Sequence, residues 1–141
     1  MKVCILNPGS QELTQHFRAA LRQALPGVRI DTCGSQTELA QQCRPVSSDI
    51  LAVVALAANA QELQDLRFLE EWPSKPKLLL VLPSNAPEIV ALGHRLRPAF
   101  VSYIWEGFAA IAGVLAHLVN RKTLDAGKSG TDFQEMQNSI D

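Results

Sequence analysis

The chain has 141 residues, of which 47% are apolar and 19% are charged, and its formal net charge is −1 at pH 7. This length supports one domain with a sizeable core, and the composition excludes an intrinsically disordered chain. The 13 lysine and arginine residues are scattered, so we expect neither nucleic acid nor an anionic membrane surface as a partner. The three cysteines form no disulfide framework and the first apolar run is too short for a signal peptide, so we predict a cytoplasmic domain.

The first part of the chain predicts a strand, a turn and a helix. Residues 3–6 are all apolar, and the Asn7-Pro8-Gly9 sequence that follows contains two residues that end regular structure. Apolar residues then recur at helical spacing from Leu13 to Ala24, and Ser10 is a suitable N-cap for this helix. Pro26-Gly27 is expected to end it.

The next two strands differ in polarity. Residues 28–32 alternate apolar and polar side chains, which is typical of a half-exposed strand at the edge of a sheet. Ser35 and Glu38 have the spacing of a capping box and predict the start of a second helix. The segment that follows Asp49, up to Ala60, is apolar on both faces and contains no carboxylate, which predicts a central parallel strand.

The rest of the chain repeats the alternation of helix and strand. We expect a helix over residues 63–72, a strand over 78–82, a helix over 87–96, a strand over 100–105 and a helix over 108–119. Five successive strand–helix units predict an α/β fold, a doubly wound five-stranded parallel sheet with helices on both faces. The two most apolar strands belong inside the sheet, which the flavodoxin-like (CheY-like) order 2-1-3-4-5 satisfies, and any binding site then lies at the carboxyl ends of the strands.

The domain is expected to cover residues 1–122, and residues 123–141 lie outside the alternation. Residues 125–130 have the composition of a linker, and the apolar residues within 132–140 have helical spacing. This terminal segment is either a frayed tail or a short helix that docks or pairs.

Two segments resemble the response-regulator receiver domains of two-component signalling. Ser102-Tyr103-Ile104-Trp105-Glu106-Gly107-Phe108 is similar to the Asp-Tyr-Leu-x-Lys-Pro-Phe junction between the last strand and the last helix of that family. Asp49-Ile50 is similar to the Pro-Asp-Ile start of its third strand. The resemblance extends from residue 2 to about residue 122 and implies a signalling domain of the same fold.

The residues that would carry phosphoryl chemistry are missing at the matching positions. Receivers hold Mg²⁺ with an acidic pair after the first strand and the acceptor aspartate, and this chain has Asn7 and Pro8 in place of the pair. The acceptor position falls on Val54, or on Ala55 after a one-residue slip, and the lysine position holds Glu106. Phosphoryl transfer needs positive charge around the moving oxygens. The resemblance therefore predicts a degenerate pseudo-receiver that is not phosphorylated on aspartate, has no metal or cofactor and is not an enzyme.

Two residues match the conformational switch of the family. Ser84 stands at the switch hydroxyl and Tyr103 at the switch aromatic, so both can be remnants of a switch. In the alternative, Ser84 is a turn residue between Pro83 and Pro87, and Tyr103 packs in its strand. We favour this alternative because a switch without its trigger has nothing to report.

Two functions of different kinds remain. The first is binding to other proteins, because the last helix is apolar or small almost without interruption from 109 to 116 and a partner is expected on its second face. We expect a homodimer and control of an effector domain or partner protein. The predicted interface residues are Trp105, Ile111, Leu115 and Leu118. The second function is a small-ligand module that binds an anion or nucleotide over residues 7–10 and 84–85.

Overall fold

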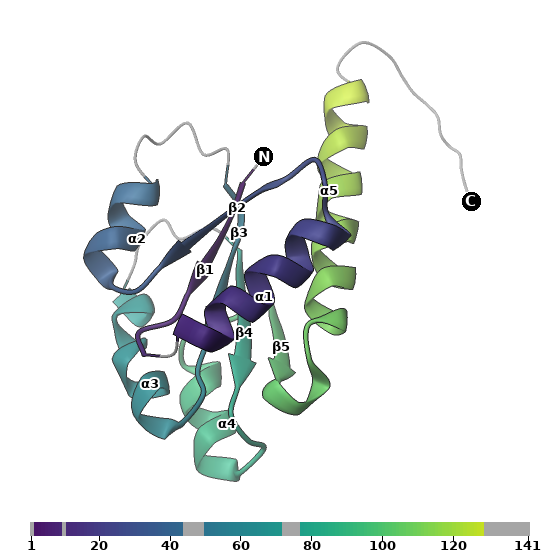
Figure 1. Ribbon diagram of the computed structural model, residues 1–141. Coiled ribbons are helices and arrows are strands. Elements are labelled where there is room, and N and C mark those ends of the chain that lie inside the picture. The colour runs from purple at the N-terminus through teal and green to yellow at the C-terminus, as the bar shows by residue number, and fades with distance from the viewer. Residues whose placement is uncertain (1, 10, 44–49, 72–76, 129–141) are drawn as a thin grey trace.

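The computed structural model describes residues 2–9, 11–43, 50–71 and 77–128, and within them five parallel strands form one sheet. The strands are β1 (Lys2–Leu6), β2 (Arg29–Cys33), β3 (Ile50–Leu56), β4 (Leu78–Leu82) and β5 (Phe100–Tyr103). The helices are α1 (Gln11–Ala24), α2 (Gln36–Cys43), α3 (Ala60–Asp65), α4 (Pro87–His94) and α5 (Ala109–Lys128), with the 3₁₀ turns η1 (Arg67–Glu71) and η2 (Ile104–Glu106). Figure 1 shows the strands with the helices packed around them.

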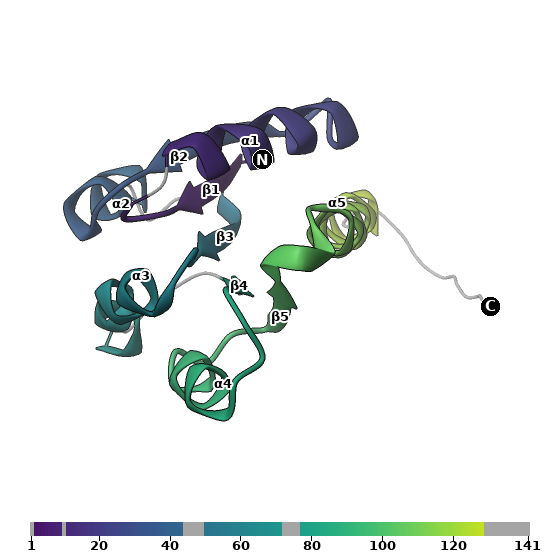
Figure 2. The same ribbon diagram turned by 60° about the horizontal axis from the view of Figure 1, so that its bottom comes forward.

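The strand order β2-β1-β3-β4-β5 confirms the predicted flavodoxin-like topology. Helices α1 and α5 cover one face of the sheet, and α2, α3 and α4 cover the other (Figure 2). Successive residues of β3 supply the two cores in turn, so Val54 and Leu56 face α1 and α5 while Val53 and Ala55 face the opposite helices. This is why β3 is apolar throughout, and all seven of its residues are buried.

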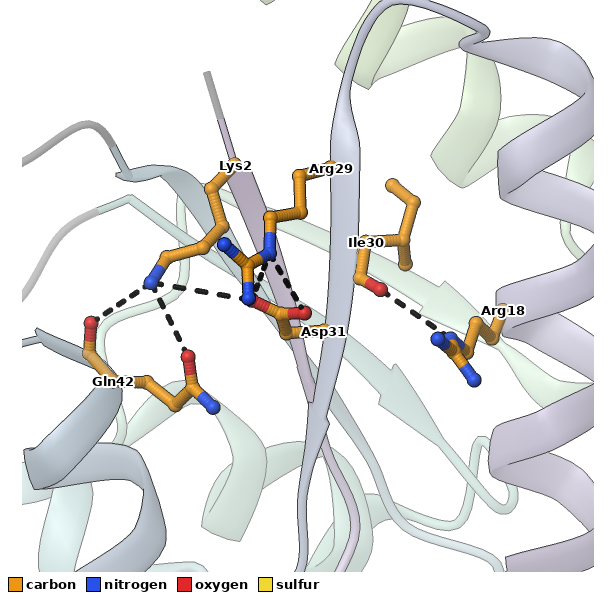
Figure 3. A network of polar contacts seen from close by, with 6 residues as sticks. All are labelled: Lys2, Arg18, Arg29, Ile30, Asp31 and Gln42. Carbon is orange, nitrogen blue, oxygen red and sulfur yellow. Dashed lines mark hydrogen bonds and ion pairs between the residues drawn. The ribbon is translucent and has the colours of Figure 1, made fainter.

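Polar side chains hold the edge strand β2 in place (Figure 3). Lys2 at the start of β1 donates from Nζ to the backbone oxygen of Gln42 at 3.1 Å and to its Oε1 at 3.2 Å, and lies 4.0 Å from Oδ2 of Asp31. On the other face, Arg18 of α1 donates from Nε to the carbonyl oxygen of Ile30 at 3.3 Å. These contacts fasten the last turn of α2 and the middle of α1 to the edge of the sheet.

Two elements in the second half of the chain end earlier than predicted. The third helix is divided, because α3 ends at Asp65 and the 3₁₀ turn η1 continues the chain to Glu71. The last strand ends at Tyr103, so Trp105 lies in the turn η2 and not in the strand.

Helix α5 is longer than predicted. It continues to Lys128, past the predicted end at residue 119, so residues 125–128 are helical. Its last turns project past the end of the sheet (Figure 1). No helix in the part of the chain that the structure describes is long and apolar enough to cross a membrane. The predicted helix 132–140 lies outside the described residues.

Candidate functional site

The carboxyl ends of β1 and β3 meet at one edge of the sheet, where the family resemblance places its phosphorylation pocket. Leu6 pairs with Ala55, so Asn7 comes to lie opposite Leu56. Asn7 is buried, and its Nδ2 donates to the carbonyl oxygen of Leu56 at 2.7 Å. Its backbone N–H donates to the carbonyl oxygen of Cys33, the last residue of β2, at 3.1 Å. Asn7 therefore connects three neighbouring strand ends.

A carboxylate does occupy this place, but it comes from α3. Glu62 is buried, and its Oε1 accepts hydrogen bonds from Nδ2 of Asn7 at 3.0 Å and from the backbone N–H of Ala58 at 2.8 Å. Its own backbone N–H donates to Oδ1 of Asn59, the N-cap of α3, at 2.9 Å. Asn59 and Glu62 have the spacing of a capping box, which turns the side chain back toward the loop that precedes the helix. One carboxylate oxygen thus joins the loops after β1 and β3.

The turn after β1 is shaped to receive this carboxylate. Oδ1 of Asn7 accepts from the backbone N–H of Gly9 at 3.0 Å, which is an Asx turn. A Cβ atom on Gly9 would overlap the carboxylate of Glu62. Glycine at this position allows the backbone to approach the buried acid. We refer to Asn7, Gly9 and Glu62 as the Asn7–Glu62 cluster.

The predicted acceptor position, Val54, does not reach this cluster. Val54 pairs with Ile5, and its side chain is fully buried in the core under α1 and α5. In the structure Leu56, and not Val54, lies opposite Asn7, because β3 continues to Leu56. Neither Leu56 nor Ala57 carries a nucleophilic atom, so the end of β3 offers no acceptor side chain.

The residues at this edge do not fit a magnesium ion. Mg²⁺ requires oxygen ligands in near-octahedral geometry, usually including carboxylates. Asn7 directs an N–H donor at Glu62 and uses Oδ1 for Gly9, while the side chain of Pro8 has no ligand atom. Across the described ranges, no three His, Cys, Asp or Glu side chains are grouped to hold a metal ion. Two hydrogen-bond donors contact Oε1 of the Glu62 carboxylate.

Ser84 lies in the loop after β4 and is half-buried. Its Oγ accepts a hydrogen bond from the backbone N–H of Ala86 at 3.3 Å. This is the local contact of a turn residue, and it supports the turn interpretation of Ser84.

Glu106, at the position of the family's lysine, folds back onto its own strand. Its Oε1 accepts from Oγ of Ser102 at 2.9 Å and from the backbone N–H of Tyr103 at 3.1 Å. Gly107, at the position of the family's proline, has φ 70° and ψ −160°, a conformation that is essentially restricted to glycine. Proline fixes φ near −65°. The junction therefore differs from the Lys-Pro pattern in backbone path as well as in charge.

An exposed aromatic pair lies beside this junction. Trp105 is 61% exposed and stacks on Tyr103, with ring centroids 4.6 Å apart and ring planes 9° apart. Tyr103 in turn packs against the core that α3 and α4 cover. Phe108, at 36% exposure, makes an edge contact with His16 of α1. Trp105 is thus a large apolar group held at the surface by a packed neighbour, a combination typical of contact sites.

Two of the four predicted interface residues belong to the core. Ile111 and Leu115 are fully buried between α5 and the sheet. Their assignment to an interface is wrong, because residues four apart form the stripe that a helix buries on its own domain. Leu118 is partly buried against the same core, which leaves Trp105 as the exposed member of the set.

A polar cleft of about 640 Å³ lies between the loops after β1 and β2. Residues 7–9 and the first turns of α1 line one side, and residues 32–35 with α2 line the other. A hydrogen bond from Cys33, one of the lining residues, lowers the pKa of the buried Cys4 thiol. Ser84 and Asn85 are not among the lining residues that the structure describes, so the cleft covers only the first half of the predicted anion or nucleotide site.

Sequence reasoning missed Glu62 and the cleft. The available signal for Glu62 is a capping-box acid immediately before the buried Leu63. The signal for the cleft is Thr14, a polar residue on the buried face of α1 that also carries Phe17. Buried polar residues require partners, so a polar residue on an apolar helix face indicates a polar environment in the fold.

Comparison with known proteins supports the architecture. No protein-family model matches the sequence, and no curated protein matches it. Among solved structures, the chain is similar to the crystal structure of a response regulator receiver protein from Pseudoalteromonas atlantica. The TM-score is 0.58 at 16% sequence identity, and the match covers 91% of this chain and 100% of the other. At this identity the likeness defines the fold class, and the chain has the fold of a receiver domain.

Proposed function

We propose that this chain is a receiver-like signalling domain that acts through protein–protein contacts and is not phosphorylated on aspartate. The observation that carries the proposal is the Asn7–Glu62 cluster, which takes the place of an acceptor and its metal at the ends of β1 and β3. The receiver fold itself supports a regulatory role.

The electrostatics of this edge support the first part of the proposal. A phosphoryl group would need a nucleophile, a metal ion and a positively charged partner. This edge instead has the carboxylate of Glu62, and the position of the family's lysine holds a glutamate. Both carboxylates already accept two hydrogen bonds each through Oε1, and an incoming phosphoryl group would meet like charge.

The surface beside β5 supports the second part. Trp105 is large, exposed and stacked on Tyr103, so little conformational entropy is lost when a partner covers it. Helix α5, which follows this turn, has the exposed small residues Ala109 and Gly113, which permit close approach of another chain. We propose that a second copy of the chain binds here, and that the domain regulates an effector domain or partner protein.

Treatment with acetyl phosphate, or with beryllofluoride, each with Mg²⁺, tests the phosphorylation part of the proposal. We expect no added phosphoryl mass and no change in the amide NMR signals of Asn7, Ala58 and Glu62. A receiver domain with its acidic residues intact, treated in parallel, serves as the positive control. Stoichiometric phosphorylation, or saturable beryllofluoride shifts at these residues, would overturn it.

A further inference from the structure

We propose that the polar cleft between α1 and α2 binds a small, uncharged, polyhydroxylated ligand, a sugar or a polyol. This binding site is additional to the protein–protein contact proposed above and does not depend on it. The inference rests on the position of the cleft, the chemistry of its lining and its charge.

The cleft lies at the carboxyl ends of the strands, the end of the sheet at which doubly wound folds bind ligands. It opens at the carboxyl ends of β1 and β2, and the connections from these strands lead to α1 and α2 on opposite faces of the sheet (Figure 2). Ligands of doubly wound sheets bind outside the carboxyl ends of the strands, and in this strand order the usual site is between β1 and β3, so the cleft shares the β1 side of that site. Its volume of about 640 Å³ falls within the range of small-molecule pockets.

The floor of the cleft is polar and fixed. Asn7, Thr14 and Cys33 line it and are buried. Asn7 is held by its bonds to Leu56 and Gly9, so its position is set before any ligand arrives. A floor that is already ordered lowers the entropy cost of binding.

The wall carries groups that both donate and accept hydrogen bonds. Side-chain amides line it together with the hydroxyls of Thr32 and Ser35, and Lys2 orients one of the amides through Oε1 of Gln42. The amide residues on the wall are Gln11, Gln15, Gln41 and Gln42. A hydroxyl of a sugar or polyol also donates and accepts, so it can bond to either the carbonyl oxygen or the NH₂ group of a side-chain amide. Within the described lining there is no aromatic or large aliphatic side chain to stack on a nucleobase.

The charge of the cleft excludes the anion that the sequence suggested. Glu38 is the one charged side chain among the described lining residues, and its Oε1 accepts from the backbone N–H of Gly34 at 2.6 Å. Ser35 caps the same turn by accepting from the N–H of Glu38 at 3.2 Å. The start of α2 is therefore already balanced by its own acid, and Glu12 stands in the first turn of α1. Among the described lining residues an anion would meet a carboxylate and no cation, whereas an uncharged ligand would not be repelled.

Titration of the ¹⁵N-labelled protein with D-glucose and with ribitol tests the proposal, with inorganic phosphate and spermidine as charged comparisons. We expect saturable shifts at the amides of Gly9, Thr14 and Gly34 with at least one of the two uncharged probes. Gln15→Ala should weaken this binding about fivefold, the effect of one lost hydrogen bond. Gln23→Ala is the matched control, since Gln23 is exposed farther along α1 and outside the lining.

Each other outcome counts against the proposal. Shifts that do not saturate with either uncharged probe, or binding that Gln15→Ala leaves unchanged, would overturn it. Saturable binding of phosphate or spermidine in preference to both uncharged probes would overturn the assigned ligand chemistry. The thermal unfolding of Gln15→Ala, compared with that of Gln23→Ala, separates loss of binding from loss of fold.

Discussion

Glu62 joins two loops that a metal ion would join in a receiver with its acidic residues intact. Its Oε1 lies 3.0 Å from Nδ2 of Asn7 and 2.8 Å from the backbone N of Ala58. The hydrogen bond from Asn7 is buried and the one from Ala58 is partly buried, so water does not fully replace the acceptor when it is removed. The single side chain therefore has a structural role that its exposed neighbours in α3 lack.

Glu62→Ala is expected to destabilise the domain by about 1–3 kcal/mol, because it leaves two donors without an acceptor in a buried setting. Urea unfolding followed by circular dichroism measures this loss. Gln64→Ala on the exposed side of the same helix is the control, and it should change the free energy of unfolding by less than about 0.5 kcal/mol. Equal effects of the two substitutions would show that the Glu62 contacts do not stabilise the fold.

Gly9→Ala tests the same cluster from the opposite side, because its methyl group would overlap the Glu62 carboxylate. We expect it to destabilise the domain, whereas Gly27→Ala, whose added Cβ meets open space, serves as the comparison. In the double variant Gly9→Ala with Glu62→Ala, the two losses in unfolding free energy should not add, since both remove one contact. Additive losses in the urea experiment would contradict a shared contact.

Individual residues of the site were harder to predict than the pattern around them. The turn at Asn7 and Pro8 was predictable because an apolar run followed by a breaker marks a strand end. The end of β3 was not, because an apolar run does not show where its strand ends, and Val54 lies two residues before that end on the same face as Leu56. Glu62 was not predicted because one of its partners, Asn7, comes from the loop after another strand, although the spacing from Asn59 was an available signal.

The junction between β5 and α5 shows how an element can keep its place while its backbone path changes. The chain leaves the strand at Tyr103, makes the turn η2 and enters α5 after Gly107. The N–H of Gly107 donates to the carbonyl oxygen of Ile104 at 3.1 Å, and its φ is 70°. Glu106 and Gly107 directly follow Trp105, so their conformations help to set the orientation of Trp105 at the surface.

Gly107→Pro, which restores the residue of the family pattern, is expected to destabilise the domain by about 3 kcal/mol or more. Proline cannot adopt this φ and removes the N–H donor to Ile104. Thermal unfolding measures the effect. Gly113→Ala is the opposite control, because Gly113 is exposed within α5 and alanine there should stabilise by about 0.5–1 kcal/mol. A proline variant as stable as the parent would show that the junction readily adopts the family's backbone path.

At the scale of the whole molecule, the fold was predictable because its determinants are repeated along the chain. Five apolar segments alternate with helices, and their polarity alone places β3 inside the sheet and β2 at its edge. The residues that form binding surfaces show no such repeat along the chain. Ile111 and Leu115 resemble interface residues in sequence, and only the contact of α5 with the sheet shows that they belong to the core. The exposed part of this region consists of one face of α5 and the ring of Trp105 stacked on Tyr103.

Trp105 is therefore the residue on which self-association of the whole domain is expected to depend. Sedimentation velocity over a concentration series should show a monomer–dimer equilibrium. Trp105→Ala should raise the dimer dissociation constant about thirtyfold, because about 2 kcal/mol is lost at a central aromatic contact. The thermal stability of the variant should stay close to that of the parent, because the Trp105 side chain is 61% exposed. Trp105→Phe keeps an aromatic ring on Tyr103 and should retain most of the association. A parent protein that stays monomeric throughout, or a Trp105→Ala variant that dimerises as the parent does, would contradict a homodimer through this face.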